Sequence, residues 1–311
     1  MKIMPRQDIS LKKHSNYRIG GPAEYFFEAK NPAELKAAVR EAKRRGLSIF
    51  VIGHATNLLF PDEGLRGLAL KVSWDFVKKA RGGISAGAGT PITKILAASA
   101  RAKLSGLEWA GGLPGTLGGA IRGNAGCFGG EMKDVVKDVT SLDVKTLRLI
   151  KRPLRQCKFG YRTSIFKQQP GREIILAATL SLQPGGNPNI IRRKIREKVT
   201  YRRHRHPMEY PNIGSIFKNV PLAALPAGQQ RALQSKAKTD PFPVVPAAYL
   251  IAQTGLPGVS SGGAMISPKH PNFIVNVLDA RAEDVNRLIA LVKKTVKKKF
   301  RIELEEEIQR A

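Results

Sequence analysis

Three glycine-rich segments contain residues whose types and spacing could hold a phosphate-bearing cofactor. They span residues 52–59, 87–91 and 111–126. Glycine lets backbone N–H groups come close to a pyrophosphate and permits positive φ. Hydroxyl groups within the same segments could donate hydrogen bonds to phosphate oxygens, and they belong to Thr56, Thr90 and Thr116. Such glycines also serve tight turns and bulges, but three segments so close together favour a dinucleotide held by loops.

The best-known nucleotide fingerprints do not occur in these segments. The sequence has no G-x-x-x-x-G-K-[ST] and no G-x-G-x-x-G between an expected strand and helix. These patterns mark P-loop and Rossmann sites. Their absence from the sequence argues against both kinds of site.

Metal and thiol chemistry find little support. His204 and His206 could be two ligands on one face of a strand, but no third ligand is near in sequence and flanking arginines would repel a cation. Cys127 lies inside a glycine segment, where it could approach a cofactor, although a lone cysteine without a base more often only packs. We therefore expect no metal. The sequence has two cysteines, Cys127 and Cys157, which excludes a disulfide scaffold and favours a reducing cytoplasm.

The charge balance is the most unusual property of the composition. Lys and Arg number 53 and Asp and Glu 24, a formal net charge of +29. Part of this is a solvated surface, but it also predicts contact with polyanions: nucleic acid, a membrane surface or phosphate-bearing small molecules. The densest part, residues 190–205, has eight Lys or Arg and one Glu.

The length of 311 residues suggests two domains, at ~150 residues per domain. No stretch approaches the ~18 apolar residues of a membrane span, and the first residues lack the apolar region of a signal peptide.

The elements that must position the glycine segments can be predicted from local pattern. Asn31 as N-cap, Pro32 at the first turn and Gly46 after the end indicate a helix over 32–45. A buried strand over 47–52 leads directly into the first glycine segment. Further strands are expected at 68–72, 83–86, 136–150 and 173–183, and further helices at 91–103, 190–205 and 282–299. A breaker cluster at 185–188 indicates a domain boundary.

The order of motifs along the chain resembles the UDP-N-acetylenolpyruvoylglucosamine reductase (MurB) family, flavoenzymes of peptidoglycan precursor synthesis. The matching stretches are Y-R-I-G-G-P-A at 17–23, the loop at 53–59 with D-E-G-L-R-G at 62–67, the loop at 113–130, F-G-Y-R-T-S-I-F-K at 159–167, Y-P-N-I-G-S-I-F-K-N at 210–219, the stretch 262–276 and the end at 300–308. Each is weak alone, but their order over residues 15–308 is specific.

This resemblance implies an α+β fold. A two-lobed, loop-type FAD-binding domain like that of the PCMH/vanillyl-alcohol-oxidase enzymes would occupy residues 1–186, with lobes at about 15–70 and 71–186. A smaller α+β substrate-binding domain would occupy 187–311, with its C-terminal tail returning to the active site. FAD would be the cofactor and NADPH the hydride donor. The cofactor-binding residues would be Gly53, His54, Ala55, Thr56, Asn57, Leu58, Gly89, Gly115, Thr116, Gly118, Gly119, Asn124 and Gly126.

The resemblance also implies a reaction, the reduction of UDP-N-acetylglucosamine enolpyruvate to UDP-N-acetylmuramate. Such chemistry needs a cation at the developing charge, a proton donor and a polarising partner. Arg162, Ser215 and Glu307 would fill these three roles, with Glu307 selected from three adjacent glutamates only by the family's ending. The substrate-binding residues would be Tyr161, Arg205, Lys218, Asn219, Lys269, His270 and Asn272.

Departures from the family pattern and two rival functions remain open. His54 and Ala55 stand where the family commonly has glycine, so either the backbone there has negative φ or FAD binding is altered. One rival is another FAD-dependent oxidoreductase on the same fold. The other is a basic nucleic-acid-binding or surface-binding protein without catalysis. We expect the UDP-sugar and NADPH as partners in the cytoplasm, no membrane, and no nucleic acid despite the charge.

Overall fold

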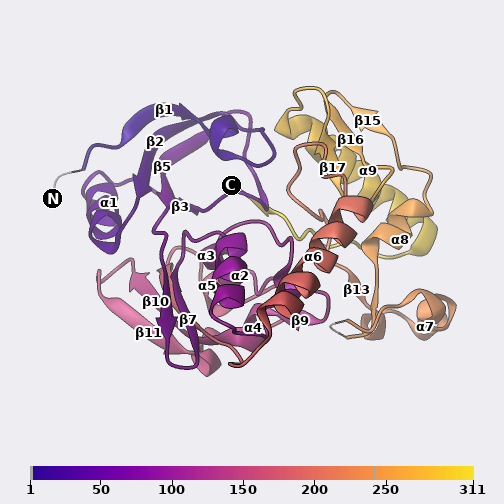
Figure 1. Ribbon diagram of the computed structural model, residues 1–311. Coiled ribbons are helices and arrows are strands. Elements are labelled where there is room, and N and C mark those ends of the chain that lie inside the picture. Colours follow the sequence, from indigo (N-terminus) through magenta and orange to yellow (C-terminus); the bar gives the residue numbers. More distant parts are fainter. Residues whose placement is uncertain (1–2, 241) are drawn as a thin grey trace. The chain divides into compact units, whose positions relative to one another are not determined.

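The computed structural model describes residues 3–240 and 242–311, which form two compact units with separate apolar cores (Figure 1). The first unit contains residues 3–9, Ala23–His54 and Leu65–Tyr201. The second contains Ser10–Pro22, Ala55–Gly64 and Arg202–Ala311. Two early segments of the chain therefore belong to the unit of the C-terminal third. The functional boundary at residue 187 remains a prediction.

A four-stranded sheet with one covering helix forms the first lobe of the first unit. Its strand order is β1 (Arg6–Ser10), β2 (Pro22–Ala29), β5 (Leu65–Val72) and β3 (Ile49–Ile52), with β2 and β3 both parallel to β5. Helix α1 (Pro32–Arg44) lies beside this sheet (Figure 1). The apolar side chains of α1 belong to the core of the first unit. The predicted caps are confirmed: Asn31 accepts a hydrogen bond from the Glu34 N–H, and Gly46 has a φ of 67°.

An antiparallel five-stranded sheet forms the second lobe. Its strand order is β11 (Leu149–Pro153), β10 (Val136–Asp143), β12 (Glu173–Ser181), β7 (Gly83–Gly87) and β6 (Val77–Ala80). The predicted strand 136–150 is therefore two strands, because the Asp143 side chain accepts hydrogen bonds from Thr146 and holds a turn between them.

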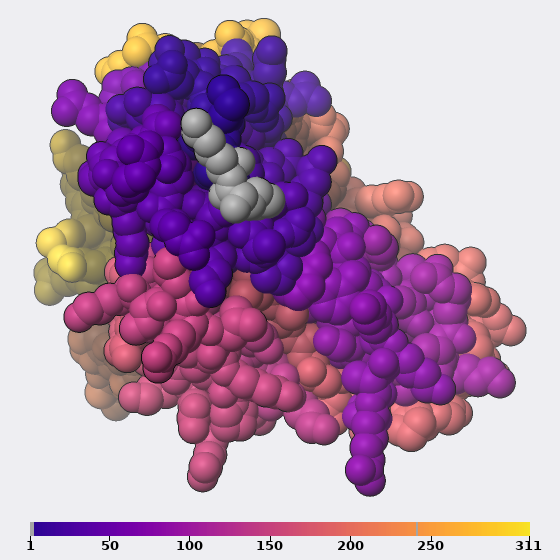
Figure 2. Space-filling model, turned by 90° about the vertical axis from the view of Figure 1, so that its left-hand side faces the viewer, coloured from indigo at the N-terminus to yellow at the C-terminus, as the bar shows by residue number. Residues whose placement is uncertain are grey.

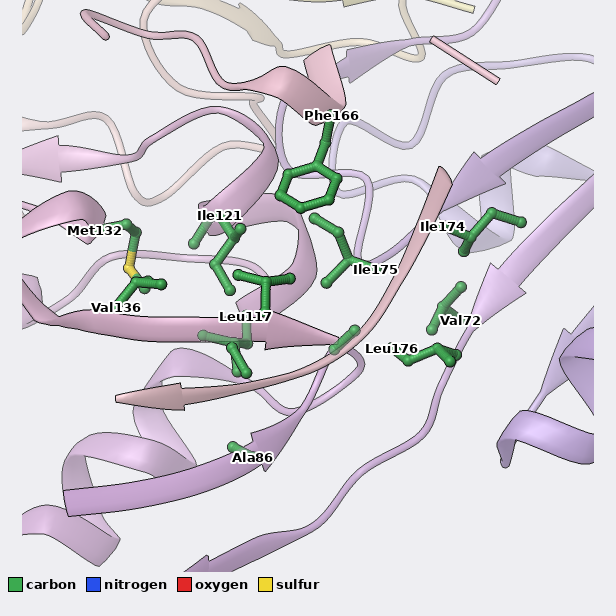
Figure 3. Close-up of a cluster of buried hydrophobic side chains, with 14 of the residues drawn as sticks. Val72, Ala86, Leu117, Ile121, Met132, Val136, Phe166, Ile174, Ile175 and Leu176 are labelled. Carbon is green, nitrogen blue, oxygen red and sulfur yellow. The ribbon is translucent and has the colours of Figure 1, made fainter. Parts of the chain in front are cut away.

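Short helices cover this second sheet. They are α2 (Ile92–Arg101), α3 (Leu117–Arg122), α4 (Met132–Val135) and α5 (Ile165–Gln168), and the two-residue strands β8 (Gly126–Cys127) and β9 (Gly130–Glu131) pair beside them. In Figure 3, Leu117 and Ile121 of α3 lie against Phe166 of α5 and Ile175 of β12. The apolar core thus lies directly beneath the second and third glycine segments and holds them in place.

The basic segment forms one long helix, α6 (Pro188–Arg205), of which only Ile191 is fully buried. The Lys198 ammonium lies 4.9 Å from the ring centroid of Phe128, and the Tyr201 ring meets Phe128 edge-on. These contacts fix the helix on the third glycine segment. Most arginines of α6 are exposed, and they are Arg192, Arg193, Arg196, Arg203 and Arg205. In Figure 2 single long side chains project from the purple and pink segments of the first unit.

The second unit packs small sheets against a long helix, α9 (Ala282–Phe300). As predicted, Val285, Leu288, Ile289, Val292 and Val296 form its buried face. Strands β15 (Ser260–Ser261), β16 (Ala264–Ile266) and β17 (Ile274–Asn276) form an antiparallel sheet. Strand β13 (Val220–Pro221) pairs with β14 (Val244–Val245), and β4 (Leu58–Leu59) pairs in parallel with β18 (Gln309–Arg310). Helices α7 (Ala227–Leu233) and α8 (Ala247–Ala252) complete the unit.

No helix among the described residues is both long enough and apolar enough to span a lipid bilayer.

Candidate functional site

The predicted cofactor loops of the first unit lie against one another. A Cβ added to Gly53 would be 2.6 Å from Thr116 Oγ1, and one added to Gly118 would be 2.9 Å from the Ala88 Cβ. The Gly118 N–H donates to the Ala88 carbonyl at 2.9 Å. Side chains at Gly53 and Gly118 would therefore push the loops apart. Gly119 has only Thr116 Oγ1 within reach of an added Cβ, at 3.7 Å, so the backbone there remains open to a ligand.

A buried polar atom beside these loops also fits a bound cofactor. The indole of Trp109 packs beneath Gly130, and its Nε1 is buried without a hydrogen-bond partner among the described residues. Buried donors without partners are rare in folded proteins, and a ligand can satisfy them. The predicted hydroxyl donor Thr90 is a different case, because its Oγ1 is already bonded to the backbone N–H and carbonyl of Phe76. The Thr90 hydroxyl therefore stabilises the backbone at Phe76.

The first loop contains a left-handed alanine. Ala55 has a φ of 48°, whereas His54 is not in the positive-φ region. Of the two alternatives, a negative φ is therefore ruled out at Ala55, whose conformation glycine adopts more readily. Burial, and secondarily the charge of Lys71, lowers the pKa of His54 below its ordinary value of 6.5. His54 is thus mostly neutral at neutral pH.

The side chain of Asn124 ties the third glycine segment to the turn at 160–163. Asn124 is fully buried with a φ of 44°, which asparagine adopts more readily than most residues. Its Nδ2 donates to the Gly160 carbonyl at 2.9 Å and to Glu131 Oε2 at 3.2 Å, and its Oδ1 accepts from the Lys133 N–H at 3.0 Å. All of these partners belong to the protein, so Asn124 shapes the loop.

Arg162 lies in that tight turn, where Gly160 and Thr163 exchange backbone hydrogen bonds. Its φ is 56°, and its side chain is 18% exposed. The guanidinium donates from Nη2 to the Gly126 carbonyl at 3.0 Å and lies 5.0 Å from the ring centroid of Tyr161. The predicted catalytic arginine is thus held against the third glycine segment, in the first unit.

Ser215 lies in the second unit, in a loop that asparagines fix from both sides. On the N-terminal side, Asn212 donates from Nδ2 to the Tyr210 carbonyl at 2.9 Å and accepts from the Gly214 N–H at 3.1 Å. Gly214 has a φ of 81°, a conformation that favours glycine. The backbone therefore enters Ser215 along a defined path.

On the C-terminal side, Asn272 holds the two residues after the serine. Its Oδ1 accepts from the Phe217 N–H at 3.0 Å, its Nδ2 donates to the Phe217 carbonyl at 2.9 Å, and its backbone carbonyl accepts from the Ile216 N–H at 2.8 Å. Asn272 is 3% exposed. Both polar ends of its side chain are used within the protein.

The C-terminal tail lies beside the same loop. The Glu307 N–H donates to the Ile216 carbonyl at 2.8 Å. Asn57 donates from Nδ2 to the Glu307 carbonyl at 3.2 Å, and the Asn57 carbonyl accepts from the Gln309 N–H at 3.0 Å. Glu307 is therefore fastened next to the serine loop on one side and to the first glycine segment on the other, within the second unit.

The two glutamates that precede Glu307 both form ion pairs. Glu305 forms an exposed ion pair with Lys218, while Glu306 pairs with Lys293 and Arg310. These ion pairs commit the carboxylates of Glu305 and Glu306 to lysine and arginine. The selection of Glu307 from these three glutamates rests on the resemblance to the family's C-terminal ending.

The other predicted substrate-binding residues have varied environments in the second unit. Asn219 Oδ1 accepts from the Ala247 N–H at 3.2 Å. Lys269 donates to the Arg203 carbonyl at 3.1 Å and pairs with Glu209. Arg205, at the end of α6, is exposed.

Two histidines form a partly buried cluster. The rings of His206 and His270 lie 5.0 Å apart, and each also contacts Phe273. Burial lowers the pKa of His206 to about 3, with added repulsion from His270, and lowers that of His270 to about 4. Both imidazoles are neutral at neutral pH. In the part of the chain that the structure describes, no group of three or more His, Cys, Asp or Glu could hold a metal.

The sequence interpretation missed two residues of the candidate site, Asn212 in the second unit and Glu131 in the first. Asn212 was quoted only as part of a motif, although an asparagine two residues before a glycine is a signal for a side-chain-capped turn. Glu131 was not singled out. Its signal is the acidic residue three positions later, because Glu131 and Asp134 form a reciprocal capping box at the start of α4.

Comparisons with known proteins match both parts of the chain. A family described as "UDP-N-acetylenolpyruvoylglucosamine reductase, C-terminal domain" matches residues 206–311, and one described as "FAD binding domain" matches residues 23–146. The UDP-N-acetylenolpyruvoylglucosamine reductase of Lachnoclostridium phytofermentans is 37% identical over 305 residues, covering 96% of this chain and 90% of the relative. That of Clostridioides difficile is 33% identical over 317 residues, covering 99% and 95%. The crystal structure of the enzyme (MurB) from Thermus caldophilus superposes with a TM-score of 0.77 at 30% identity, covering 99% of both chains.

Proposed function

Because this chain belongs to the UDP-N-acetylenolpyruvoylglucosamine reductase family, we propose that Arg162, Ser215 and Glu307 carry out the chemistry of that family's reaction. The chain is an FAD-dependent oxidoreductase of peptidoglycan precursor synthesis and uses NADPH. It reduces UDP-N-acetylglucosamine enolpyruvate to UDP-N-acetylmuramate. The roles of individual residues, and the division into domains at residue 187, are our proposals.

The glycine loops of the first unit would hold FAD. The open backbone at Gly119, the close approach of Gly53 to Thr116 and the unpartnered Trp109 Nε1 fit a ligand lying along these loops. Bound FAD would supply the redox chemistry there, the passage of a hydride from NADPH to the substrate. Asn57, Ala55 and Asn124 would shape the loops, and His54 either contacts a phosphate or points to solvent.

Arg162 would bind the carboxylate of the enolpyruvyl group. Arrival of a hydride at the β-carbon leaves carbanion character at the α-carbon, next to this carboxylate. The charge spreads into an enolate-like dianion, which a guanidinium can stabilise through two parallel hydrogen bonds. The contacts of Arg162 with Gly126 and Tyr161 restrict the orientation in which the guanidinium can do so.

Ser215 would donate the proton that completes the reaction at the α-carbon. Serine is a weak acid, but the carbanion is a far stronger base, so the transfer is downhill. Glu307 would polarise the reacting group beside it. The observation that most supports this pairing is the hydrogen bond from the Glu307 N–H to the Ile216 carbonyl, one residue from Ser215.

Three side chains would bind the UDP-sugar directly, those of Tyr161, Lys218 and Lys269, with Arg205 nearby. Asn219, His270 and Asn272 would contribute by stabilising the loops that surround it. We expect the excess positive charge to act on phosphate-bearing substrates and not on nucleic acid. We also propose a cytoplasmic location, with which the free thiols of Cys127 and Cys157 agree.

The test is Ser215→Ala in stopped-flow experiments that separate the two half-reactions. Reduction of the flavin by NADPH, followed near ~450 nm, should be nearly unchanged because Ser215 acts only after that step. Reoxidation by the enolpyruvyl substrate should slow by ~10²-fold or more. Normal reoxidation would remove Ser215 from the mechanism. Wild-type reoxidation by a different enol or enone, but not by the UDP-sugar, would instead favour another oxidoreductase on this fold.

A further inference from the structure

Glu131 is a buried carboxylate for which the proposed mechanism so far has no use. It is 5% exposed, in the first unit. Its Oε2 lies 2.7 Å from the Lys133 ammonium and accepts from Asn124 Nδ2 at 3.2 Å. Its Oε1 is buried and has no hydrogen-bond partner among the described residues. That oxygen lies 4.0 Å from Nη1 of Arg162.

A buried carboxylate oxygen without a hydrogen bond is unfavourable, because it has lost water and gained nothing in return. The other carboxylate oxygen, Oε2, already serves the helix cap and the ion pair with Lys133. In the part of the chain that the structure describes, the cationic group within ion-pair distance of Oε1 is the guanidinium of Arg162. Capping of α4 therefore explains the contacts of Oε2, whereas the charge of Arg162 explains why Oε1 is buried where it is.

The backbone and the side chain of Arg162 are both constrained. Its φ of 56° is unusual for a residue with a Cβ. Nη2 is directed to the Gly126 carbonyl, the Tyr161 ring lies near the guanidinium carbon, and Glu131 attracts Nη1. At 4.0 Å the Glu131 carboxylate attracts the guanidinium through charge, without the short, paired hydrogen bonds of a bidentate ion pair.

The geometry points to Glu131 as the positioning residue of Arg162, acting through charge to aim the guanidinium at the enolpyruvyl carboxylate. This inference rests on the proposed role of Arg162. It predicts that Glu131 matters only in the half-reaction in which Arg162 acts, and only while Arg162 is present.

The experiment is a double-mutant cycle of Glu131→Gln and Arg162→Ala, with FAD content checked from the visible spectrum. Glutamine keeps the size of the side chain and an oxygen for the helix cap but removes the charge. Reoxidation by the enolpyruvyl substrate should slow ~10–100-fold in Glu131→Gln, because a misplaced catalytic group costs up to about 10²-fold. Flavin reduction by NADPH should stay within about threefold. In the Arg162→Ala background, Glu131→Gln should have no further effect on reoxidation.

Lys133→Met is the matched control. Lys133 contacts the same carboxylate but not Arg162, and its side chain is 47% exposed. Its loss should leave reoxidation within about twofold of wild type, because exposed ion pairs contribute little. If Glu131→Gln does not retain FAD, Glu131→Asp takes its place in the cycle. Aspartate keeps the negative charge, but its side chain is one methylene shorter, so the carboxylate lies farther from Arg162. Reoxidation should slow at least about threefold, again only when Arg162 is present.

The outcomes separate this inference from the proposed function. If Glu131→Gln slows reoxidation equally with and without Arg162, Glu131 is not its positioning residue, while the role of Arg162 stands. If Arg162→Ala alone reoxidises normally, the proposed role of Arg162 fails, and the inference fails with it. Equal slowing of both half-reactions by Glu131→Gln would show a general effect on the loop and would also overturn the inference.

Discussion

Asn272→Ala tests whether the frame around Ser215 matters for catalysis. The substitution leaves the Asn272 backbone carbonyl in place but removes both side-chain hydrogen bonds to Phe217. Phe217 is 1% exposed, so its N–H and carbonyl would lose their partners in a buried place. Each unsatisfied buried group costs about 1–3 kcal/mol, and partial entry of water reduces this, so we expect a total loss of about 2–4 kcal/mol in the free energy of unfolding.

The same change should also disturb the proton step. Ser215 is two residues before Phe217, and a shift of about 1 Å in a catalytic group can cost ~10²-fold in rate. We expect reoxidation by the enolpyruvyl substrate to slow at least about tenfold. Reduction by NADPH should remain near the wild-type rate, because Ser215 is not used there.

Asn276→Ala is the matched control for Asn272→Ala. Asn276 is 6% exposed, donates to the Tyr17 carbonyl and accepts from the Ala280 N–H, so its loss removes the same number of buried hydrogen bonds. Both variants should lose similar stability in urea unfolding followed by circular dichroism, but only Asn272→Ala should lose reoxidation rate. Equal reoxidation rates in the two variants, at temperatures where both are folded, would refute the positioning argument.

Three further predictions concern charge. Glu307→Gln should slow reoxidation ~10²-fold while Glu305→Gln, at an exposed ion pair, should change it less than about threefold; similar losses would contradict the choice of Glu307. His206 and His270 have folded-state pKa values lowered to about 3 and about 4, so the unfolded chain takes up more protons below about 6.5 and stability should fall as pH decreases. After halving for partial exposure we expect a loss of about 2 kcal/mol between pH 7 and 5 in urea titrations, absent when both are phenylalanine. The basic segment 192–205 should steer NADPH and the UDP-sugar, so kcat/KM should fall with ionic strength as screening shortens to ~8 Å near 0.15 M, and kinetics independent of salt would rule this out.

Elements with complete local signals could be predicted from the sequence almost to the residue. The helix predicted at 32–45 is α1, because its N-cap, its proline and its terminal glycine all lie within the segment itself. Helix α9 has an apolar face with clear helical spacing. Strands β4 and β18 could not be found this way. Each has two residues, and they pair only because distant parts of the chain meet.

The candidate site shows the same limit. Motif resemblance could point to Arg162 and Ser215, since their types and neighbours are characteristic. It could not assign the role of Asn272, because an amide side chain can bind either a substrate or the protein backbone. In the structure this amide forms hydrogen bonds with the backbone of Phe217. The partner of Glu131 was equally hidden, because Arg162 is far from it in sequence and comes near only through the fold.

The pairing of β4 with β18 has a consequence for the newly made chain. The second unit needs residues 10–22 and 55–64 together with the tail near Gln309. Ribosomes add roughly 5–20 residues per second, so these early segments would wait on the order of 10–50 s for their partners. During that time Tyr17, Ile19 and Leu59, which are buried in the finished second unit, lack their core. The first unit has no such dependence on the tail. The nascent protein should therefore carry a finished first unit and exposed apolar segments together, a state that attracts chaperones and that brief heat stress during synthesis would turn into aggregates.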